Sequence, residues 1–512
     1  MGPVAGSFLM AKLGICAAFL LAVVGASGAS EAWAADVTPT KAPAASAMTP
    51  RPCTDPSDFV TTNCQLTWEG ITVFGIIDTG FGWQSHGASF DPRSAVAASY
   101  LIQKQNRLAT WTLAPNALSN STIGIKGTRP IGEDFSFVFD LDAGFDPYSL
   151  RFSNGPGSIA ANAGVPQNLQ TAYSDSSRAG QWYNGQGYVG VSSPTYGTLT
   201  LFRQNSLTLD AVFDYDPFGA SYGFSAIGFQ GITCGGGNTE NCRHSTSVKY
   251  RYNFNHFRAA ALWQFGGYDE NNASTGAYQF QLGGDIPIRG NDVLSVDAIY
   301  SHVKNSVSLA LASGANANNA FGAPIPPFLP QTLTATISDN TAAMLVARYT
   351  TKSLKLYAGY EYIRYEPPSN PQVAFTDIAG NFLCQGCDAL NNTNINNAAF
   401  GVGGLGNKTF QVMWAGAKYS ITDDLDVIGA YYHYIQDSFF GTAARGPAFC
   451  SSSEHPQCAG TFDAISTAVD WRFAPKWDTY VGVMFTQVNG GLGFGFFEHS
   501  NVATTAGLRF RF

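Results

Sequence analysis

Charged residues are scarce in this chain, because Asp, Glu, Lys and Arg make up only 12% of its 512 residues. Water-soluble domains carry about 25%, so this surface is not built mainly for contact with water. Long apolar stretches are absent after position 35, which excludes a bundle of transmembrane helices. A basic excess is missing too: 28 Lys and Arg face 36 Asp and Glu, which gives no electrostatic case for nucleic acid as a partner.

Glycine and aromatic residues are abundant instead. The chain holds 55 glycines, aromatic residues make up 13%, and the mean hydropathy is -0.03. Aromatic and β-branched residues at this level exclude a disordered chain. The composition therefore indicates a large all-β protein.

The first 34 residues have the pattern of a secretory signal peptide. Lys12 supplies the positive charge, residues 13–24 the apolar stretch, and residues 32–34 (AWA) a small-residue cleavage site. A membrane anchor is the alternative, but the apolar stretch is too short to span a bilayer. We expect residues 35–67, rich in Ala, Pro and Thr, to form a periplasmic lead-in, and residues 68–512 to form the main domain.

Nine cysteines are consistent with export to an oxidising compartment. Cys16 lies in the signal, and the other eight occur as near neighbours in the sequence. Eight cysteines allow 105 connectivities, but proximity favours four short loops: Cys53 with Cys64, Cys234 with Cys242, Cys384 with Cys387, and Cys450 with Cys458. Metal or redox chemistry at the CxxC of residues 384–387 is the alternative, although no second ligand pair is nearby in sequence.

After residue 67 the chain repeats stretches of about ten residues that alternate apolar and polar side chains. Residues 135–145 place phenylalanines on one face and Asp140 and Asp142 on the other. Residues 257–265 place Phe and Trp opposite Arg258. In residues 243–252 the polar face is expected to carry Arg243, Ser245, Ser247, Lys249 and Arg251.

We count about sixteen such strands. Their centres fall near residues 76, 125, 140, 187, 202, 248, 262, 282, 299, 346, 360, 414, 431, 467, 482 and 506. Short turns alternate with long connections, which include residues 85–118, 146–180, 206–242, 305–340, 367–408 and 439–460. An even number of antiparallel strands joined in this way is typical of outer-membrane barrels. In hydrocarbon every backbone amide must be paired, so a sheet can cross only as a closed barrel.

The alternation has a direct consequence for a barrel. Its apolar face would contact outer-membrane lipid, and its polar face would line a lumen too wide for side chains to fill. The competing interpretation is a soluble β-rich binding protein with the apolar faces packed together inside.

Several stretches resemble the trimeric general porins of the Gram-negative outer membrane: residues 70–80 (GITVFGIIDTG), 121–127 (STIGIKG), 139–145 (FDLDAGF), 187–191 (GYVGV), 196–201 (YGTLTL) and 203–204 (RQ). The resemblance covers nearly all of residues 68–512. It implies a homotrimer that passes small hydrophilic solutes and ions by passive diffusion; a substrate-selective channel is the alternative. It also implies that the barrel-assembly machinery recognises the C-terminal Phe510 and Phe512.

The resemblance further implies that the third external loop, residues 206–242, folds into the barrel and narrows it. Acids of that loop would face a ladder of bases across the constriction, and the candidates are Asp210, Asp214, Asp216, Arg243, Lys249 and Arg251. Thr122 and Gly185 stand where the family often has arginine, so the ion preference stays open. Further candidate lumen charges are Asp78, Asp140, Asp142, Arg258, Asp285, Asp297, Arg348, Glu361, Asp470, Arg472 and Arg509.

Two short motifs of enzymes do not fit their surroundings. Residues 219–223 (GASYG) match the GxSxG elbow of hydrolases, but that elbow needs a strand-to-helix turn. Residues 401–406 (GVGGLG) match GxGxxG, but a predicted strand rather than a helix follows. The seven histidines are scattered without ligand spacing. We therefore expect no enzyme activity, no cofactor and no metal site.

Overall fold

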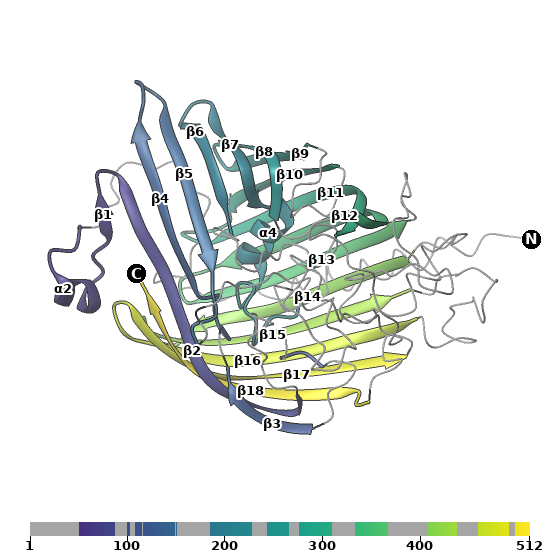
Figure 1. Cartoon of the computed structure of the whole chain (residues 1–512). Helices are drawn as coiled ribbons and strands as arrows, with labels where there is room; N and C mark the ends of the chain where they lie inside the picture. Colours follow the sequence, from purple (N-terminus) through teal and green to yellow (C-terminus); the bar gives the residue numbers. More distant parts are fainter. Residues whose placement is uncertain are drawn as a thin grey trace, which may run out of the picture.

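The chain folds as an antiparallel β-barrel (Figure 1). The structure, a computed structural model, describes residues 51–87, 100–102, 108–114, 116–148, 150, 185–227, 243–265, 276–309, 333–366, 408–437, 459–490 and 497–512. Two helices are described, α2 (Pro56–Thr61) and α4 (Leu207–Tyr215). Neither is long and apolar enough to cross a membrane.

Sixteen strands close the barrel. They are β2 (Ile71–Gly87), β4 (Thr122–Pro130), β5 (Ser136–Gly144), β6 (Gly187–Ser193), β7 (Gly197–Asn205), β8 (Arg243–Phe254), β9 (Phe257–Gln264), β10 (Gly276–Pro287), β11 (Val293–Leu309), β12 (Leu333–Thr350), β13 (Leu354–Glu366), β14 (Lys408–Ser420), β15 (Leu425–Gln436), β16 (Gly460–Ala474), β17 (Trp477–Gly490) and β18 (Ser500–Arg511). Each predicted strand centre lies inside one of them, so the predicted strands are confirmed.

The sheet closes where the last strand meets the first. Arg509 of β18 is the register partner of Asp78 in β2, and neighbouring strands are antiparallel around the ring. Two shorter strands, β1 (Leu66–Trp68) and β3 (Leu108–Leu113), add to the two ends of β2. β3 lies within the long connection predicted over residues 85–118 and is a strand that the alternation did not indicate; its residues pair with the end of β2 that β4 does not reach.

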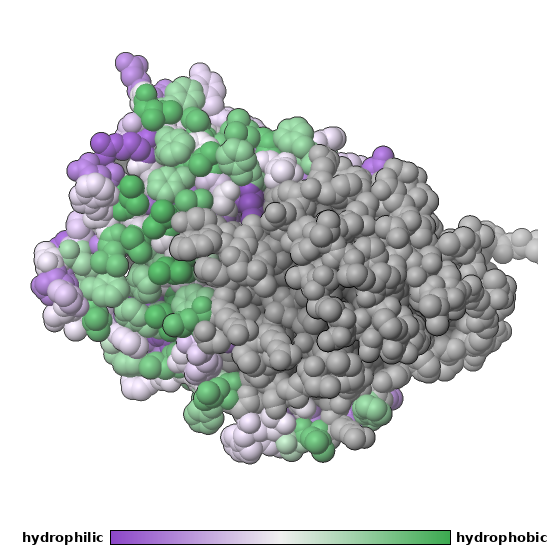
Figure 2. Space-filling view, viewed as in Figure 1, coloured by the Kyte–Doolittle hydropathy of each residue, from purple (hydrophilic) through white to green (hydrophobic). Residues whose placement is uncertain are grey.

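The two faces of the strands separate as the alternation predicts. On β9, Phe257 and Trp263 are exposed on the outside, whereas Leu262 and Gln264 point inward and are buried. Asp140 and Asp142 lie on the inner face of β5, opposite its exposed Phe137. In Figure 2, apolar residues cover much of the described outer surface, and hydrophilic residues gather toward the end with the turns. This apolar outer face argues against the soluble protein, which would bury it.

The lead-in includes ordered structure next to the barrel. Cys53 and Cys64 form a disulfide around α2, as their proximity predicts. The proposed signal at residues 1–34, the first part of the lead-in (residues 35–50), and the other three cysteine pairs (234/242, 384/387 and 450/458) lie outside the described residues.

Candidate functional site

The loop after β7 runs inside the barrel. Ser206 caps α4, since its hydroxyl accepts a hydrogen bond of 3.0 Å from the backbone N–H of Leu209. The backbone N–H of Leu207 donates to Gln279 Oε1 of β10 at 2.5 Å. The helix also contacts β9, β11, β12 and β13. The first turns of the loop are therefore held against the part of the barrel wall that β9–β13 form.

Apolar packing fixes the loop across the lumen. Its buried side chains join a cluster with inward residues of the wall: Leu207, Leu209, Val212, Phe224 and Ile227 from the loop, and Met344, Val346, Phe410, Trp414, Tyr432, Phe462 and Met484 from β12–β17. The expectation that the lumen face is polar is therefore wrong for this part of the wall. Burial of these side chains away from water stabilises the inward position of the loop.

Hydrogen bonds from the wall add to this anchoring. Trp414 Nε1 donates to the carbonyl of Tyr215 at 3.0 Å, and the Tyr434 hydroxyl donates to the carbonyl of Ala226 at 2.5 Å. Beyond them, the backbone N–H of Gly223 donates to the carbonyl of Ala117 at 2.7 Å. The loop thus has contacts on opposite sides of the barrel and divides its interior.

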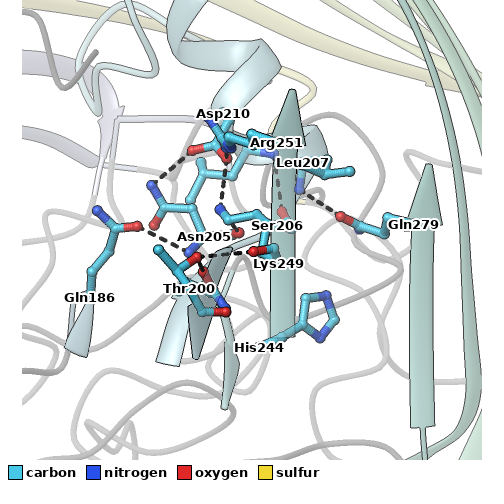
Figure 3. Close-up of polar contacts among 12 residues, drawn as sticks. Gln186, Thr200, Asn205, Ser206, Leu207, Asp210, His244, Lys249, Arg251 and Gln279 are labelled. Carbon is cyan, nitrogen blue, oxygen red and sulfur yellow. Dashed lines mark hydrogen bonds and ion pairs between the residues drawn. The ribbon is translucent and has the colours of Figure 1, made fainter. Parts of the chain in front are cut away.

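The helix brings one acid to the bases of β8 (Figure 3). Asp210 Oδ2 lies 3.0 Å from Lys249 Nζ and also accepts from Arg251 Nη2. Asn205 Nδ2 donates to the other carboxylate oxygen at 3.2 Å. Burial alone would raise the pKa of Asp210, but the charges of Lys249 and Arg251 hold it below its usual range. Acid and bases are therefore in contact rather than opposed across water.

A second cluster forms at the other end of α4. Arg258 Nη2 lies 2.8 Å from Asp297 Oδ2 and 2.6 Å from the Tyr215 hydroxyl, and Arg258 Nη1 lies 3.0 Å from Asp285. Arg348 donates to the carbonyl of Asp214 at 2.8 Å, and its guanidinium lies over the Tyr215 ring at 5.7 Å. Tyr215 thus holds two wall arginines close to the loop.

In most of these ion pairs the arginine is more exposed than its acid, whereas Lys249 (6% exposed) is less exposed than Asp210 (14%). The Arg258 side chain is 25% exposed and that of Asp297 2%; the values for Arg251 and Asp210 are 21% and 14%. Nearer the turn end of the barrel, the side chains of Arg472 and Arg511 are also partly exposed, while those of their partners Asp426 and Asp478 are buried. Asp285 is an exception and is half-exposed. Among these described pairs, the more exposed charge is therefore mainly that of a guanidinium group.

The comparisons with known proteins agree with this geometry. A family model described as Gram-negative porin matches residues 20–491. The chain belongs to the Gram-negative porin family. It is accordingly a multi-pass protein of the outer membrane.

Individual relatives of this porin are distant. An outer membrane porin protein of Bordetella pertussis is 25% identical over 158 residues, and that match covers 31% of this chain and 34% of the relative. Two solved structures are similar to this chain. An anion-selective porin from Comamonas acidovorans is 15% identical with a TM-score of 0.49, and the match covers 86% of this chain and 99% of that one. OmpT of Vibrio cholerae in its trimer form is 12% identical with a TM-score of 0.49, and the match covers 86% of this chain and 99% of that one.

The structure places the remaining candidate acids of the porin's third loop away from the β8 bases. Asp216 is buried and accepts hydrogen bonds from the Tyr432 hydroxyl at 2.6 Å and from the backbone N–H of Ala220 at 2.7 Å. Asp214 meets Arg348 of β12 through its backbone carbonyl. Of the three acids, only Asp210 forms ion pairs with Lys249 and Arg251.

The strand pairing is irregular around Arg243. Thr246 has a φ of 49°, and the pairing of β7 with β8 shifts between Phe202 and Gln204. The alternation is broken there, and His244 is also buried and lies 3.0 Å from Gln264. Arg243 is the register partner of Asn205, whose side chain donates to Asp210, and Arg243 Nε is buried, so Arg243 stays on the inner side of β8.

The other predicted lumen charges point inward. Asp78 accepts from the Tyr480 hydroxyl at 2.6 Å and from the backbone N–H of Ser119 at 2.7 Å. Arg509 pairs with Asp478 at 2.9 Å and with Asp470 at 3.3 Å. Glu361, Asp140 and Asp142 are buried on the inner face. These charged side chains are therefore part of the inner surface of the barrel.

Sequence reasoning missed the uncharged residues that position the loop, namely Tyr215, Asn205, Gln279 and Trp414. The only signal was that Asn205 directly precedes the loop and Tyr215 separates two of its acids. The GxSxG motif lies in this loop between strands, and no helix follows Ser221 before residue 227. Within the described residues no three His, Cys, Asp or Glu side chains could hold a metal ion; residues 401–406 lie outside them.

Proposed function

We propose that this porin forms a water-filled diffusion channel for small hydrophilic solutes and ions, with a preference for anions. The observation that carries the proposal is the exposure of Arg251 and Arg258 beside the inward loop, while Asp297 is buried behind its arginine. Exposed cations along a narrow passage raise the local concentration of anions and lower that of cations.

The constriction is assigned to the space beside α4. Asp210, Lys249 and Arg251 would form one part of its edge, and Arg258, Arg348 and Asp214 another. Because the bases contact the loop, the transverse field is weaker than that of charges separated by water. This arrangement supports general diffusion rather than strong selection of one solute.

The test is single-channel recording in a planar bilayer under a salt gradient. We expect step conductances and a reversal potential with the sign of anion preference. A cation-preferring reversal potential would refute the charge assignment and leave the channel itself intact. Silent bilayers from folded protein would refute the channel. Block by one solute at micromolar concentration would instead favour a substrate-selective pore.

We further propose a homotrimer, because the general porins that the sequence resembles are trimeric. On the outer face of the seam, the small Thr79, Thr504 and Ala506 pair with the larger Leu508, Trp83 and Phe81, and together they offer an apolar surface for a second barrel. The expected result is an oligomer in SDS that dissociates to monomers on heating. A single monomer-sized species after chemical crosslinking in native membranes would contradict it.

A further inference from the structure

The segment Arg51–Gln65 is a small folded unit at the turn end of the barrel (Figure 1). The Cys53–Cys64 disulfide closes it, and the backbone N–H of Cys53 donates to the carbonyl of Gln65 at 3.0 Å. Inside the loop, Asp58 accepts hydrogen bonds from Arg51 at 2.5 Å and from the backbone N–H of Thr54 at 3.0 Å. The unit is therefore held in shape by its own contacts.

One side chain of this unit packs against the last two phenylalanines. The Phe59 ring lies 5.7 Å from the ring of Phe510 and 5.5 Å from that of Phe512, edge to face in both cases. Phe510 also lies 4.5 Å from the ring of Trp477. Edge-to-face aromatic contacts of this kind are attractive beyond the area that they bury. The C-terminal aromatic pair is thus contacted by the N-terminal segment.

Two side chains at the turn between β16 and β17 bind the backbone of α2. Lys476 Nζ donates to the carbonyl of Phe59 at 2.7 Å and lies 4.4 Å from the centre of its ring. Trp477 Nε1 donates to the carbonyl of Val60 at 3.2 Å. Lys476 is buried. Carbonyl groups in the last turn of a helix have no hydrogen-bond partner within the helix. Lys476 and Trp477 supply donors to two such carbonyl groups of α2.

The C-terminal residue is also bound on the barrel side. The backbone groups of Phe512 and Gly75 exchange two hydrogen bonds of 2.9 Å. A Cβ placed on Gly75 would lie 2.5 Å from Cζ of Phe512, so the ring lies directly over this glycine. Phe512 is therefore enclosed by β2 on one side and by α2 on the other.

We propose that the disulfide-closed segment Arg51–Gln65 is an intramolecular clasp that binds Phe510 and Phe512 in the finished barrel. It joins the N-terminal lead-in to the last strand at the seam between β18 and β2, and it covers the aromatic side chains of the chain end. A partner that recognises an extended strand ending in phenylalanine could bind this porin only while the clasp is open. The proposal concerns the chain end and does not depend on the charge preference of the pore.

The test uses trimming of the chain end by carboxypeptidase A on the folded, detergent-solubilised protein. This enzyme removes a C-terminal phenylalanine and stops at arginine, so intact mass reports the loss of Phe512 alone. We expect slow trimming of the wild type and trimming about tenfold faster for Phe59→Ala, which loses both aromatic contacts. The control is Val60→Ala, because this side chain is exposed and the carbonyl bound by Trp477 remains.

A second arm avoids variants that fold poorly. Folded wild-type protein and the double variant Cys53→Ser/Cys64→Ser are each reduced with dithiothreitol, alkylated and desalted before the protease is added, because a dithiol would bind the zinc of the protease. We expect reduction to speed trimming of the wild type and to leave the double variant, already fast, unchanged. Equal trimming of wild type and Phe59→Ala, with no effect of reduction, would overturn the clasp. Bilayer conductance of the same samples separates this outcome from a failure of the channel proposal, since the clasp lies outside the lumen.

Discussion

The ammonium group of Lys249 lies 3.0 Å from the carboxylate of Asp210, so a base of the barrel wall is paired directly with an acid of the inward loop. Arg251 shares the same carboxylate oxygen. Two bases and one acid leave this cluster with one net positive charge. The loop is thus tied to β8 by the Asp210–Lys249 ion pair, and Arg251 adds the net positive charge of the cluster.

Arg251→Gln should lower the preference for anions. The substitution removes the more exposed of the two bases, while Lys249 stays paired with Asp210 and keeps the loop in place. We expect the ratio of anion to cation permeability to fall about twofold, measured as the reversal potential in a salt gradient. Arg129→Gln is the matched control, because Arg129 lies in an exposed pair with Glu69 at the turn end. An equal shift in both variants would contradict the assignment of Arg251.

Loss of the proton from the Asp216 carboxyl group should make the inward loop less stable as pH rises. Burial raises the pKa of Asp216 to about 6, although Tyr432 and Ala220 donate hydrogen bonds to it. Because this value lies above the usual 3.8, the buried form holds its proton more tightly than the freed loop does. Loop stability is therefore complete below about pH 4 and declines up to about pH 6, by on the order of 3 kcal/mol.

Hydrogen exchange of the peptide covering residues 206–227 measures this effect. Corrected for intrinsic rates, we expect protection in the wild type to fall between about pH 4 and about pH 6. Asp216→Asn has no titrating group and should show a flat profile. Identical pH profiles for the two proteins would show that Asp216 is not the cause.

Gly75→Ala should weaken the barrel seam. A Cβ at this position would lie 2.5 Å from the ring of Phe512 and 2.8 Å from the backbone carbonyl oxygen of Thr122, and the second contact cannot be relieved by a rotamer change. We expect unfolding at a lower temperature, read from the heat-dependent mobility of the barrel in SDS. Gly132→Ala serves as control, because nothing lies within 4 Å of its added methyl group. Unchanged mobility in Gly75→Ala would contradict the packing at Gly75.

Deleting Phe512 should lower the yield of assembled porin in cells. The sequence resemblance makes this residue an assembly signal, and the structure shows that its backbone also pairs with Gly75. The measurement is the fraction of heat-modifiable barrel in outer-membrane preparations. Refolding of the same truncated chain in detergent separates loss of recognition from loss of stability. Normal assembly in cells would leave the terminal signal without support.

Leu345→Arg should destabilise the barrel in lipid. Leu345 of β12 is exposed on the outer face, and an arginine facing the bilayer midplane costs about 2–4 kcal/mol. Thr128→Arg is the control, since Thr128 is exposed on the inner face of β4 near the turn end. Denaturant titration in lipid vesicles compares the two free energies of unfolding. A cost for Thr128→Arg as large as that for Leu345→Arg would show that the outer face is not in lipid.

The strands could be predicted from the sequence because period-2 alternation is a local property. Phe257 and Trp263 share a face with or without their neighbours, and closure of the barrel follows from the need to pair every backbone amide in hydrocarbon. Where the local rule fails, so did the prediction. Thr246 with its positive φ interrupts the alternation in β8, so that His244 is buried too, and β3 forms by pairing with an edge of β2 far from it in the local pattern.

The sequence by itself therefore determined the sixteen strands, the side of each that faces lipid, and the disulfide between neighbouring cysteines. Only the tertiary structure decided which charges meet. Asp210 reaches Lys249 because α4 lies inside the barrel, Asp216 is bound by Tyr432 of β15 instead, and Phe59 meets Phe512 from the other end of the chain. These partners are separated by tens to hundreds of residues, and their contacts arise from barrel closure and loop packing, which no local pattern encodes.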